Sequence, residues 1–554
     1  MKNKTIRIGF DLDGVILYNP IRIVRPIVTL AKKILFKKPE VFTYFPKSRF
    51  EQLLWTWAHK TSFFVSPGFS KIKELAKDKN VEIYLITSRF SFLKKDLDKW
   101  LKRINSKKIF SRCFYNEKNE RAHLYKRRLV NKLRLDFFIE DNFDIVNYLS
   151  KTTKTKIFWI YNILDKHINY EFKYPNLSQA MIFFKKKTKV LITTDYFYPH
   201  WTGLSKSVFN LTKSLEDEFD FTVLTVRYSG NLKHKENIGK TKIIRINPLF
   251  SFSRVKYSPF LVYKFISILK DFDVVFINSP CSNILPISLI AKLFKKKLLI
   301  FHQGDLILPQ GLINRLIEKV FNFSSKSSFK LADKIATYSR DYAEDSRVLF
   351  PFLNKFNPLL LPILINKPNI IKKLKEDRKI TFGFAGRFVE EKGFDILFEA
   401  IPQIVKKMPN ARFVFAGETK IGYENFFEKN KDKFQRAKKW ITLLGLLNDS
   451  QMDNFYKNID FIIVPSRSDC FNYVQAEAML WDKPSIISDI PGARYLVKET
   501  GFGVLFKTEN PIDLTEKITF ALKNKEEITK NYNKVLKILN KDEIARKIKD
   551  FIEK

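Results

Sequence analysis

The feature that most constrains this chain is the regular alternation of short apolar runs with helical stretches along nearly its whole length. Runs of this kind, separated by helical segments, are typical of βαβ units and parallel sheets. The clearest runs are Ile6–Phe10, Val81–Ile86, Phe137–Ile139, Val190–Thr193, Val274–Ile277, Leu298–Phe301, Ile380–Phe384, Phe413–Phe415 and Phe461–Val464. We therefore predict an α/β fold.

Most of these runs are followed at once by small, polar or charged residues. The segments DLDG, TSR, EDN, TTD, HQGD, AGR, AGE and PSRSD each come just after an expected strand. Ligands of open α/β sheets bind at the carboxyl ends of strands. This placement favours an enzyme over a scaffold.

Length and composition suggest where the chain divides. At 554 residues it is too long for one core. A basic run at Lys185–Lys187 and a polar stretch at Asn366–Arg378 each precede a new strand. The predicted divisions are residues 1–186, two Rossmann-like units at 188–366 and 367–525, and a Lys- and Glu-rich helical tail at 526–554.

The charge balance limits the partners and the location. Lys and Arg number 100 against 58 Asp and Glu, a net charge of +42 that attracts polyanions. The basic residues are spread out and no nucleic-acid module is recognisable, so we do not expect nucleic acid as the partner. No apolar stretch reaches the roughly 20 residues of a membrane span, no signal peptide is recognisable, and the three cysteines are widely spaced. We expect a cytoplasmic protein, either soluble or peripheral to the membrane.

An aspartate pair follows the first predicted strand. Asp11 and Asp13 are two residues apart, so on an extended chain they point the same way, and Gly14 allows a tight turn. One carboxylate could attack phosphorus while the other protonates the leaving oxygen, with a divalent cation offsetting their charge. The pair alone is weak evidence, because many strand ends carry aspartates. Further polar residues in this unit extend it: Thr87, Lys126, Glu140 and Asp141.

This ordered set resembles the haloacid dehalogenase-like superfamily, over about residues 1–186 and closest to its nucleotidase-like members. The resemblance implies a Rossmann-like domain with a helical cap at about residues 18–66 and a bound Mg²⁺. It assigns Asp11 as nucleophile, Asp13 as general acid and base, Thr87 and Lys126 as phosphoryl-binding residues, and Asp11, Asp13, Glu140 and Asp141 as metal ligands. The alternative is a retained fold without activity, and the substrate is open.

Two segments further along suit a phosphorylated ligand. Gly203 stands at the start of an expected helix, where a phosphate can approach free N–H groups. Arg387 and Lys392 bracket a loop between a strand and a helix, and two cations suit a diphosphate. The alternatives are an ordinary turn and surface charge.

A third segment, PSRSDCFNYVQAEAML, places Asp469 and Glu477 on either side of a turn that opens a helix. Carboxylates accept hydrogen bonds from hydroxyl groups, so one can serve a sugar and the other a ribose. An acidic helix N-terminus without a binding role is the alternative.

Together these segments resemble glycosyltransferase family 4, retaining enzymes of the GT-B architecture, over roughly residues 188–554. The motifs that carry the resemblance are TGLSKSVFNL, FHQGD, AGRFVEEKG and the segment from Asp469 to Glu477. By this resemblance Gly203, Arg387, Lys392, Asn472 and Glu477 bind the donor, while His302 and Asp469 lie at the reacting sugar. No metal is expected for the transfer.

The segments depart from the family pattern at three positions. Asp469 stands where the family usually has Glu, Asn472 where Gly is common, and Thr202 where the first glycine of a pair is usual. A carboxylate shorter by one methylene keeps its acceptor chemistry, but its displacement can alter rate or donor preference.

The sequence therefore predicts transfer of a sugar from a nucleotide-diphosphate sugar to a glycan or lipid-linked acceptor. The surface charge would favour an anionic membrane, and the amphipathic segment Ile21–Lys38 could touch one or pack inside the cap. The competing hypothesis is a phosphatase whose GT-B part only binds a nucleotide or glycan.

Overall fold

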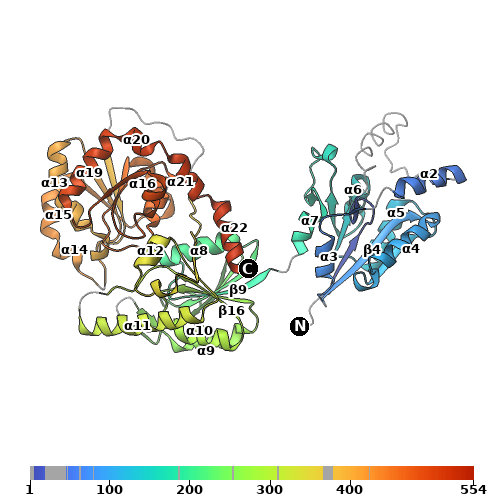
Figure 1. The fold of residues 1–554 in the computed structure, drawn as a ribbon, viewed down its shortest axis with the longest axis horizontal. Coiled ribbons are helices and arrows are strands. Elements are labelled where there is room, and N and C mark those ends of the chain that lie inside the picture. Colours follow the sequence, from blue (N-terminus) through green and yellow to red (C-terminus); the bar gives the residue numbers. More distant parts are fainter. Residues whose placement is uncertain are drawn as a thin grey trace. The chain divides into compact units, whose positions relative to one another are not determined.

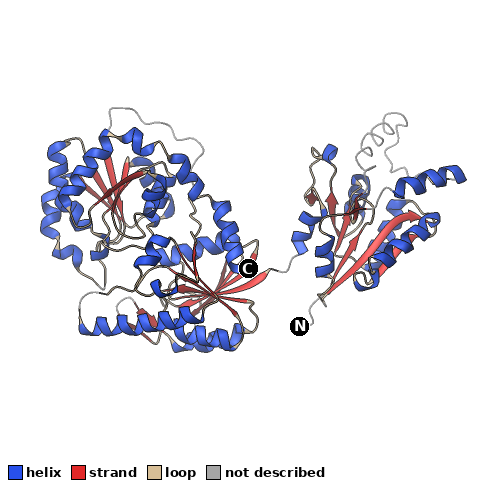
Figure 2. Ribbon diagram, viewed as in Figure 1, coloured by secondary structure: helices blue, strands red, loops and turns tan. Residues whose placement is uncertain are grey.

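The computed structural model describes residues 5–18, 45–46, 48–60, 64–78, 80–184, 187–252, 255–308, 311–365, 379–422 and 424–554. Contacts divide the chain into two units, Met1–Lys186 and Lys187–Lys554 (Figure 1). Each unit has buried cores of its own. The long sheets are parallel, apart from one edge strand, and have helices on both faces (Figure 2).

The first unit is built on a six-stranded parallel sheet in the order β5-β4-β1-β6-β7-β8. Its strands are β1 (Ile6–Phe10), β4 (Val81–Phe90), β5 (Arg112–Asn116), β6 (Phe137–Glu140), β7 (Lys156–Ile160) and β8 (Lys173–Tyr174). One face is covered by α3 (Phe69–Leu75), α4 (Lys94–Arg103) and α7 (Leu177–Ala180), the other by α5 (Ala122–Leu133) and α6 (Phe143–Thr152).

The expected cap falls partly outside the described residues. Residues 19–44, which include the amphipathic segment Ile21–Lys38, lie outside them. The described parts are a short antiparallel pair, β2 (Leu17–Tyr18) with β3 (Phe64–Val65), and α2 (Arg49–Lys60). The cap stays a prediction.

The second unit contains two lobes, and the first is an eight-stranded sheet in the order β11-β12-β10-β9-β15-β16-β17-β18. The strands are β9 (Thr188–Thr194), β10 (Phe219–Val226), β11 (Lys235–Ile238), β12 (Thr241–Ile246), β15 (Val274–Ser279), β16 (Lys297–His302), β17 (Lys334–Thr337) and β18 (Phe356–Pro358), with a separate hairpin of β13 (Phe250–Phe252) and β14 (Val255–Tyr257). The helices are α8 (Gly203–Leu215), α9 (Pro259–Leu269), α10 (Ile284–Leu293), α11 (Leu312–Leu331) and α12 (Arg340–Asp345). β15 is buried at every position, as expected for a central parallel strand covered on both faces.

The second lobe is a six-stranded parallel sheet in the order β21-β20-β19-β22-β23-β24. Its strands are β19 (Thr381–Ala385), β20 (Arg412–Ala416), β21 (Ile441–Gly445), β22 (Phe461–Val464), β23 (Ser485–Ser488) and β24 (Gly503–Phe506). Its helices are α13 (Phe394–Lys407), α14 (Phe426–Lys429), α15 (Lys431–Ala437), α16 (Asp449–Asn458), α17 (Tyr473–Leu480), α18 (Tyr495–Thr500) and α19 (Pro511–Lys523).

The C-terminal tail is helical and is divided among three helices. It forms α20 (Lys525–Thr529), α21 (Tyr532–Ile538) and α22 (Lys541–Glu553), and Asn540 caps the last by accepting a hydrogen bond from the Glu543 N–H at 2.9 Å. α22 returns to the first lobe, where the Lys297 ammonium donates to the Ile552 carbonyl at 2.9 Å. The apolar residues of α22 belong to a core shared by both lobes, which a sequence pattern cannot indicate.

The nine predicted apolar runs all form strands, and the Rossmann-type α/β character of the second unit is confirmed. The haloacid dehalogenase identity of the first unit and the exact domain limits stay predictions. Among the described residues, no helix combines the length and apolar character needed to cross a bilayer.

Candidate functional sites

The three long sheets share one winding pattern. In each, the chain enters at a central strand, adds strands on one side, and then crosses to the other side of that strand. The central strands are β1, β9 and β19, and the strands at the crossing are β6, β15 and β22. Ligands bind at such switch points in open α/β sheets. Asp11, Arg387 and Asp469 lie on the loops that follow β1, β19 and β22.

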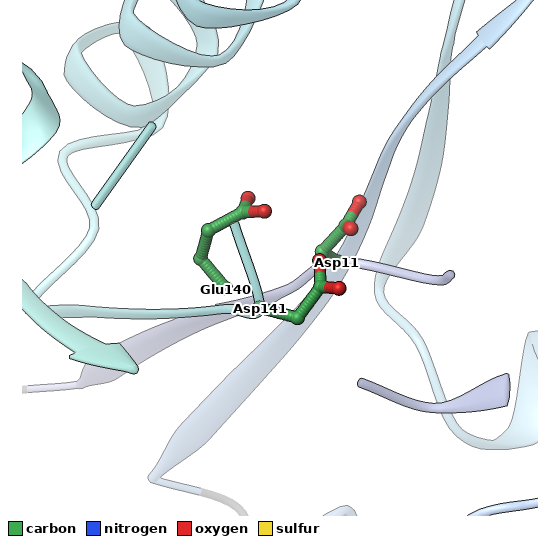
Figure 3. A group of neighbouring side chains, drawn as sticks. All are labelled: Asp11, Glu140 and Asp141. Atoms are coloured by element: carbon green, nitrogen blue, oxygen red, sulfur yellow. The ribbon is translucent and has the colours of Figure 1, made fainter. Parts of the chain in front are cut away.

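In the first unit, three buried carboxylates converge at the ends of β1 and β6. Asp11, Glu140 and Asp141 each offer an oxygen, and these oxygens lie within 4.8 Å of one another (Figure 3). Burial raises the pKa of Asp11 well above its usual range, and the neighbouring carboxylates add to the effect. Three hard oxygen donors in one buried space fit a divalent cation such as Mg²⁺.

Lys126 on α5 is the cation that this cluster already contains. Its ammonium lies 2.9 Å from Asp11 Oδ1 and 2.7 Å from Glu140 Oε2, and the side chain is almost fully buried. Burial disfavours its charge, but Asp11 and Glu140 outweigh burial and raise the pKa of Lys126. It therefore stays charged and offsets only part of the negative charge of the three carboxylates.

Asp13 lies apart from the cluster. The Arg89 guanidinium donates Nε–H to Asp13 Oδ2 at 2.8 Å and an Nη–H to Oδ1 at 2.6 Å, and His59 Nδ1 is 3.9 Å away. Burial favours the neutral acid, but Arg89 outweighs it and holds the pKa of Asp13 far below its usual range. In this arrangement Asp13 stays ionised, and it is a weak base as long as Arg89 is bound to it. The sequence reasoning assigned no role to Arg89, although it stands in the quoted segment TSR.

Thr87 and Gly14 stand on the two segments next to Asp11, because β4 pairs with β1 and Gly14 lies in the turn after β1. Thr87 is buried, and its hydroxyl accepts a hydrogen bond from the Arg89 N–H at 3.3 Å. It lies within β4, in a stretch where the pairing register is irregular, and not beyond a strand end as expected. Gly14 has φ +85°, and a Cβ there would overlap the Asp141 carboxylate, so the turn after β1 requires glycine.

In the second unit, the first turn of α8 is well capped and open. The Thr202 hydroxyl accepts from the Ser205 N–H at 3.2 Å, and the Ser205 hydroxyl accepts from the Thr202 N–H at 2.7 Å. A Cβ placed on Gly203 would meet no atom within 4 Å. The helix N-terminus thus has its positive end exposed to an approaching anion.

Lys206, in the same turn, links the two lobes. Its ammonium lies 2.6 Å from Glu477 Oε1, and the other carboxylate oxygen of Glu477 accepts a hydrogen bond from the Tyr456 hydroxyl at 2.6 Å. Glu477 is 3% exposed. This ion pair places the α8 terminus against α17, which the sequence reasoning did not anticipate.

The two predicted diphosphate-binding cations both have carboxylate partners. Lys392 donates to Asp469 Oδ2 at 2.9 Å, and Arg387 to Glu391 Oε1 at 3.3 Å. Burial lowers the pKa of Lys392, but Asp469 outweighs burial and raises it. Both cations follow β19, whose end is a switch point.

Asn472 connects these groups to Glu477. Its side-chain carbonyl caps α17 by accepting from the Gln475 N–H at 2.8 Å, while its amide donates to Asp469 Oδ2 at 2.7 Å. Asn472 therefore fixes the Asp469 carboxylate and the helix that carries Glu477. In this structure its amide contacts Asp469, and the donor contact predicted for Asn472 stays a prediction.

His302 is held on both ring nitrogens. Nδ1 lies 3.2 Å from the Ser279 hydroxyl and Nε2 lies 3.0 Å from Asp305 Oδ1, and the residue is 1% exposed. Burial works against ionisation of Asp305, but His302 and further donors lower the pKa of this carboxyl. The predicted contact between His302 and the reacting sugar therefore needs a rearrangement of these partners.

His200, which the sequence reasoning did not select, is more accessible. It precedes Gly203 by three residues and stacks on Tyr228 with ring centroids 3.7 Å apart. Burial, with the positive charges of Arg387 and Lys256, lowers its pKa to about 4, so the imidazole is neutral at pH 7. His200 and Lys206 could not be selected as site residues from the sequence, because the chain contains a large excess of basic residues.

Asp195, directly after β9, is a buried carboxyl held by neutral donors. It accepts hydrogen bonds from the Ser282 N–H at 2.8 Å and the Ser282 hydroxyl at 3.0 Å. Burial raises its pKa to about 6.

Further contacts join the two lobes at the same motifs. The Cys470 thiol donates to the Gln303 carbonyl, so the segment that begins at Asp469 lies against the end of β16. Tyr338 stacks on Phe471 with centroids 4.6 Å apart. The quoted motifs of both lobes therefore meet in one region.

Two sequence families match the second unit. Residues 201–354 match Glycosyltransferase Family 4, and residues 366–553 match Glycosyl transferases group 1.

Two relatives match much of the same region. An uncharacterized glycosyltransferase of Methanocaldococcus jannaschii is 29% identical over 350 residues, which is 61% of this chain and 89% of the relative. The N,N'-diacetylbacillosaminyl-diphospho-undecaprenol alpha-1,3-N-acetylgalactosaminyltransferase of Campylobacter jejuni is 24% identical over 334 residues, 57% of this chain and 85% of the relative.

Solved structures agree on the fold. Sucrose-phosphate synthase from Thermosynechococcus elongatus superposes with a TM-score of 0.54 at 16% identity, covering 66% of this chain and 98% of that one. The HepE protein of Anabaena, in complex with UDP and glucose, gives 0.52 at 16% identity, covering 66% and 99%. Residues 201–354 and 366–553 are therefore the two domains of a family 4, group 1 glycosyltransferase with a GT-B-like fold.

Proposed function

We propose that the second unit is a retaining glycosyltransferase that moves a sugar from a nucleotide-diphosphate sugar to a hydroxyl acceptor in surface glycan or glycolipid synthesis. The observation that carries the proposal is the 2.6 Å ion pair between Lys206 and Glu477. It brings the open N-terminus of α8 beside the residue expected to bind ribose. Lys392 reaches the same region through Asp469 and Asn472.

The donor would be held by exchange of partners. Arg387 and Lys392 would leave Glu391 and Asp469 for the diphosphate, and the N–H groups around Gly203 would add donors without a charge of their own. These groups would stabilise the negative charge that develops on the diphosphate leaving group. Glu477 would accept hydrogen bonds from the ribose, and Asp469 would face the transferred sugar.

The acceptor class is supported by a relative. The Campylobacter jejuni enzyme is named for a sugar-diphospho-undecaprenol substrate, a lipid-linked glycan. We assign the same broad class of acceptor, a glycan or lipid-linked sugar, to this chain. The phosphatase hypothesis with a GT-B binding module is not favoured, because both family matches are glycosyltransferase domains.

A radiolabelled-sugar assay tests this proposal. The purified full chain would be incubated with UDP- and GDP-sugars, and sugar release or transfer measured with and without chelator. We expect turnover that persists in chelator, is lost in Glu477→Ala and is kept in Asp11→Asn. Turnover by Glu477→Ala at the wild-type rate would refute the assigned role of the lobe junction.

For the first unit we propose a second activity, Mg²⁺-dependent phosphate release. The supporting observation is the convergence of Asp11, Glu140 and Asp141 with Lys126 among them. These three carboxylates would hold the cation, which when bound polarises a phosphoryl oxygen. Asp11 would attack phosphorus, Lys126 and Thr87 would orient the phosphoryl group, and Asp13 would handle the proton after Arg89 releases it.

Phosphate release from a panel of phosphomonoesters tests this activity. The expected pattern is the reverse of the first: dependence on Mg²⁺, loss in Asp11→Asn and retention in Glu477→Ala. If Asp11→Asn releases phosphate as fast as the wild type, the assignment of Asp11 as nucleophile is wrong.

A further inference from the structure

The outer surface of three helices in the first lobe of the second unit is unusually apolar. α9, α10 and α11 cover one face of the sheet, and their inner residues, such as Phe265, Ile287 and Phe329, are fully buried (Figure 1). Their outer residues would normally be polar. Instead, each of the three helices exposes large apolar side chains.

α11 carries the longest apolar stripe. Leu312, Leu316 and Phe323 are 84%, 63% and 68% exposed, and Ile313 and Val320 are 67% and 59% exposed. At about 100° per residue these five side chains fall in one sector about 100° wide. The buried side of the helix lies opposite this sector, at Ser325, Ser328 and Phe329.

A basic edge runs beside the stripe. Arg315, Lys319, Lys326 and Lys330 are all exposed and fall in the adjoining sector of α11. The one acidic residue of the helix, Glu318, is turned inward, where it lies 3.5 Å from Arg347 and accepts the Leu308 N–H at 2.6 Å. The exposed side of α11 thus carries only apolar and positive groups.

The neighbouring helices extend the apolar surface. Leu293 on α10 is 78% exposed, Phe294 after it is 46% exposed, and Tyr263 on α9 is 75% exposed. Contacts join α9 to α10 and α10 to α11. We call this surface the α9–α11 face. Exposed large apolar side chains gathered on neighbouring helices mark an interaction site.

We propose that the α9–α11 face binds the surface of an anionic lipid bilayer. An apolar stripe with Lys and Arg along its edge suits a helix lying in the interface, with its apolar side among the acyl chains and its cations at lipid phosphates. A second copy of the chain fits less well, because each copy has a net charge of +42 and the contact would bring exposed cations together.

The face also has a connection to the acceptor half of the transferase site. Arg347 lies near both Glu318 of α11 and Asp305, and Asp305 holds His302. A bilayer bound here would therefore lie near the loop that follows β16. This consequence rests on the proposed transferase function, whereas bilayer binding does not.

Vesicle flotation of the full chain tests the proposal. The probes are vesicles of phosphatidylcholine alone and of phosphatidylcholine with phosphatidylglycerol. We expect binding to the anionic vesicles only, weakened by salt. The double variant Leu316→Glu, Phe323→Glu should lower the partition coefficient at least about tenfold, because two apolar side chains lose their burial in the bilayer. The matched control is Ile512→Glu, Phe520→Glu on α19, where the residues are 61% and 47% exposed, and it should bind as the wild type does.

A second variant distinguishes loss of lipid binding from misfolding. The triple change Arg315→Gln, Lys319→Gln, Lys326→Gln alters only exposed charges and should lower anionic binding with no change in the unfolding midpoint. Wild-type protein that stays with the unbound fraction, or variants that float as well as wild type, would overturn the proposal. So would sedimentation that finds a dimer dissociated by Leu316→Glu, Phe323→Glu. Absence of sugar transfer would refute the proposed function and leave this result untouched.

Discussion

The carboxylate cluster of the first unit and the lobe junction of the second solve opposite charge problems. At the cluster, three buried carboxylates lie together, and Lys126 pairs with two of them, Asp11 and Glu140. At the junction, Lys206, Arg387 and Lys392 each have a carboxylate partner, so the charges are balanced in pairs. The first arrangement calls for an added cation, and the second must give up partners before it can bind an anion.

This difference teaches how the two sites would bind ligands. A cation entering the cluster would relieve repulsion among Asp11, Glu140 and Asp141, and so would stabilise the fold. A diphosphate entering the junction would replace protein carboxylates at Arg387 and Lys392, so its net gain would be smaller than the count of cations suggests. The predictions below test each half of this contrast.

The largest effect is expected at the diphosphate cations. Arg387→Ala or Lys392→Ala should lower kcat/KM for the donor by about 100- to 1,000-fold, the usual cost of removing one donor to the developing charge. Steady-state sugar transfer measures it. Arg340→Ala is the matched control, because Arg340 is exposed and forms its ion pair with Glu344 in its own helix. Equal losses in the control and the test variants would show that general positive charge, and not these two positions, drives binding.

The cluster should respond to Mg²⁺ through stability. Saturating Mg²⁺, at 100 times its Kd, should stabilise the first unit by about 2.7 kcal/mol. Calorimetry of the full chain with and without Mg²⁺ measures the shift. Asp141→Asn should abolish it, whereas Glu120→Gln, which changes an acid paired with Arg128 outside the cluster, should keep it. A shift that survives in Asp141→Asn would place the cation elsewhere.

Sequence patterns predicted much of the fold, because strand burial and the position of a loop relative to its strand depend on residues close together in the sequence. A buried parallel strand such as β15 must be apolar throughout, and a ligand loop must follow a strand end, so Asp11, Arg387 and Asp469 could be found without a structure. The same reasoning selected Glu140 and Asp141 at another strand end, and the family resemblance grouped them with Asp11 as metal ligands.

The pairings could not be predicted in the same way. Nothing near Lys206 in sequence indicates Glu477, because their ion pair depends on how two lobes meet. Arg89 and His302 show the same limit: each stands in a motif, but its partner, Asp13 for one and Asp305 for the other, decides whether its charge or ring is available. The return of α22 to the first lobe is likewise a property of tertiary packing.

Asp195 extends the contrast to a buried carboxyl that neutral donors hold, namely the Cys281 thiol and the N–H and hydroxyl of Ser282. Its folded pKa of about 6 lies above the unfolded value, so the folded state binds the extra proton and stability falls as pH rises from about 4 to about 6. The change amounts to on the order of 2 kcal/mol. Over this pH range the unfolding midpoint of Asp195→Asn should therefore rise relative to that of the wild type. At higher pH the difference between the two midpoints should stay constant. Asp345→Asn, at an exposed position, should show no such gain. A constant difference between Asp195→Asn and wild type at all pH values would contradict the assignment.

The smallest effect is expected at Lys206, and it decides how the junction binds its donor. Both carboxylate oxygens of Glu477 are already engaged, by Lys206 and by the Tyr456 hydroxyl, so a ribose must displace one of them. Lys206 could pair with Glu477 only while the donor is absent and make no contact with the bound donor. In that case Lys206→Met should tighten nucleotide binding several-fold, by about 1 kcal/mol. The unfolding midpoint should fall, because Glu477 then keeps a buried charge without its cation.

Titration calorimetry with UDP and GDP measures the affinity. Lys213→Met, two turns further along α8 and paired at the surface with Glu216, is the matched control and should change neither quantity. Weaker nucleotide binding in Lys206→Met would mean that this ammonium moves onto the diphosphate, and the balanced junction would then contribute three cations to the donor instead of two.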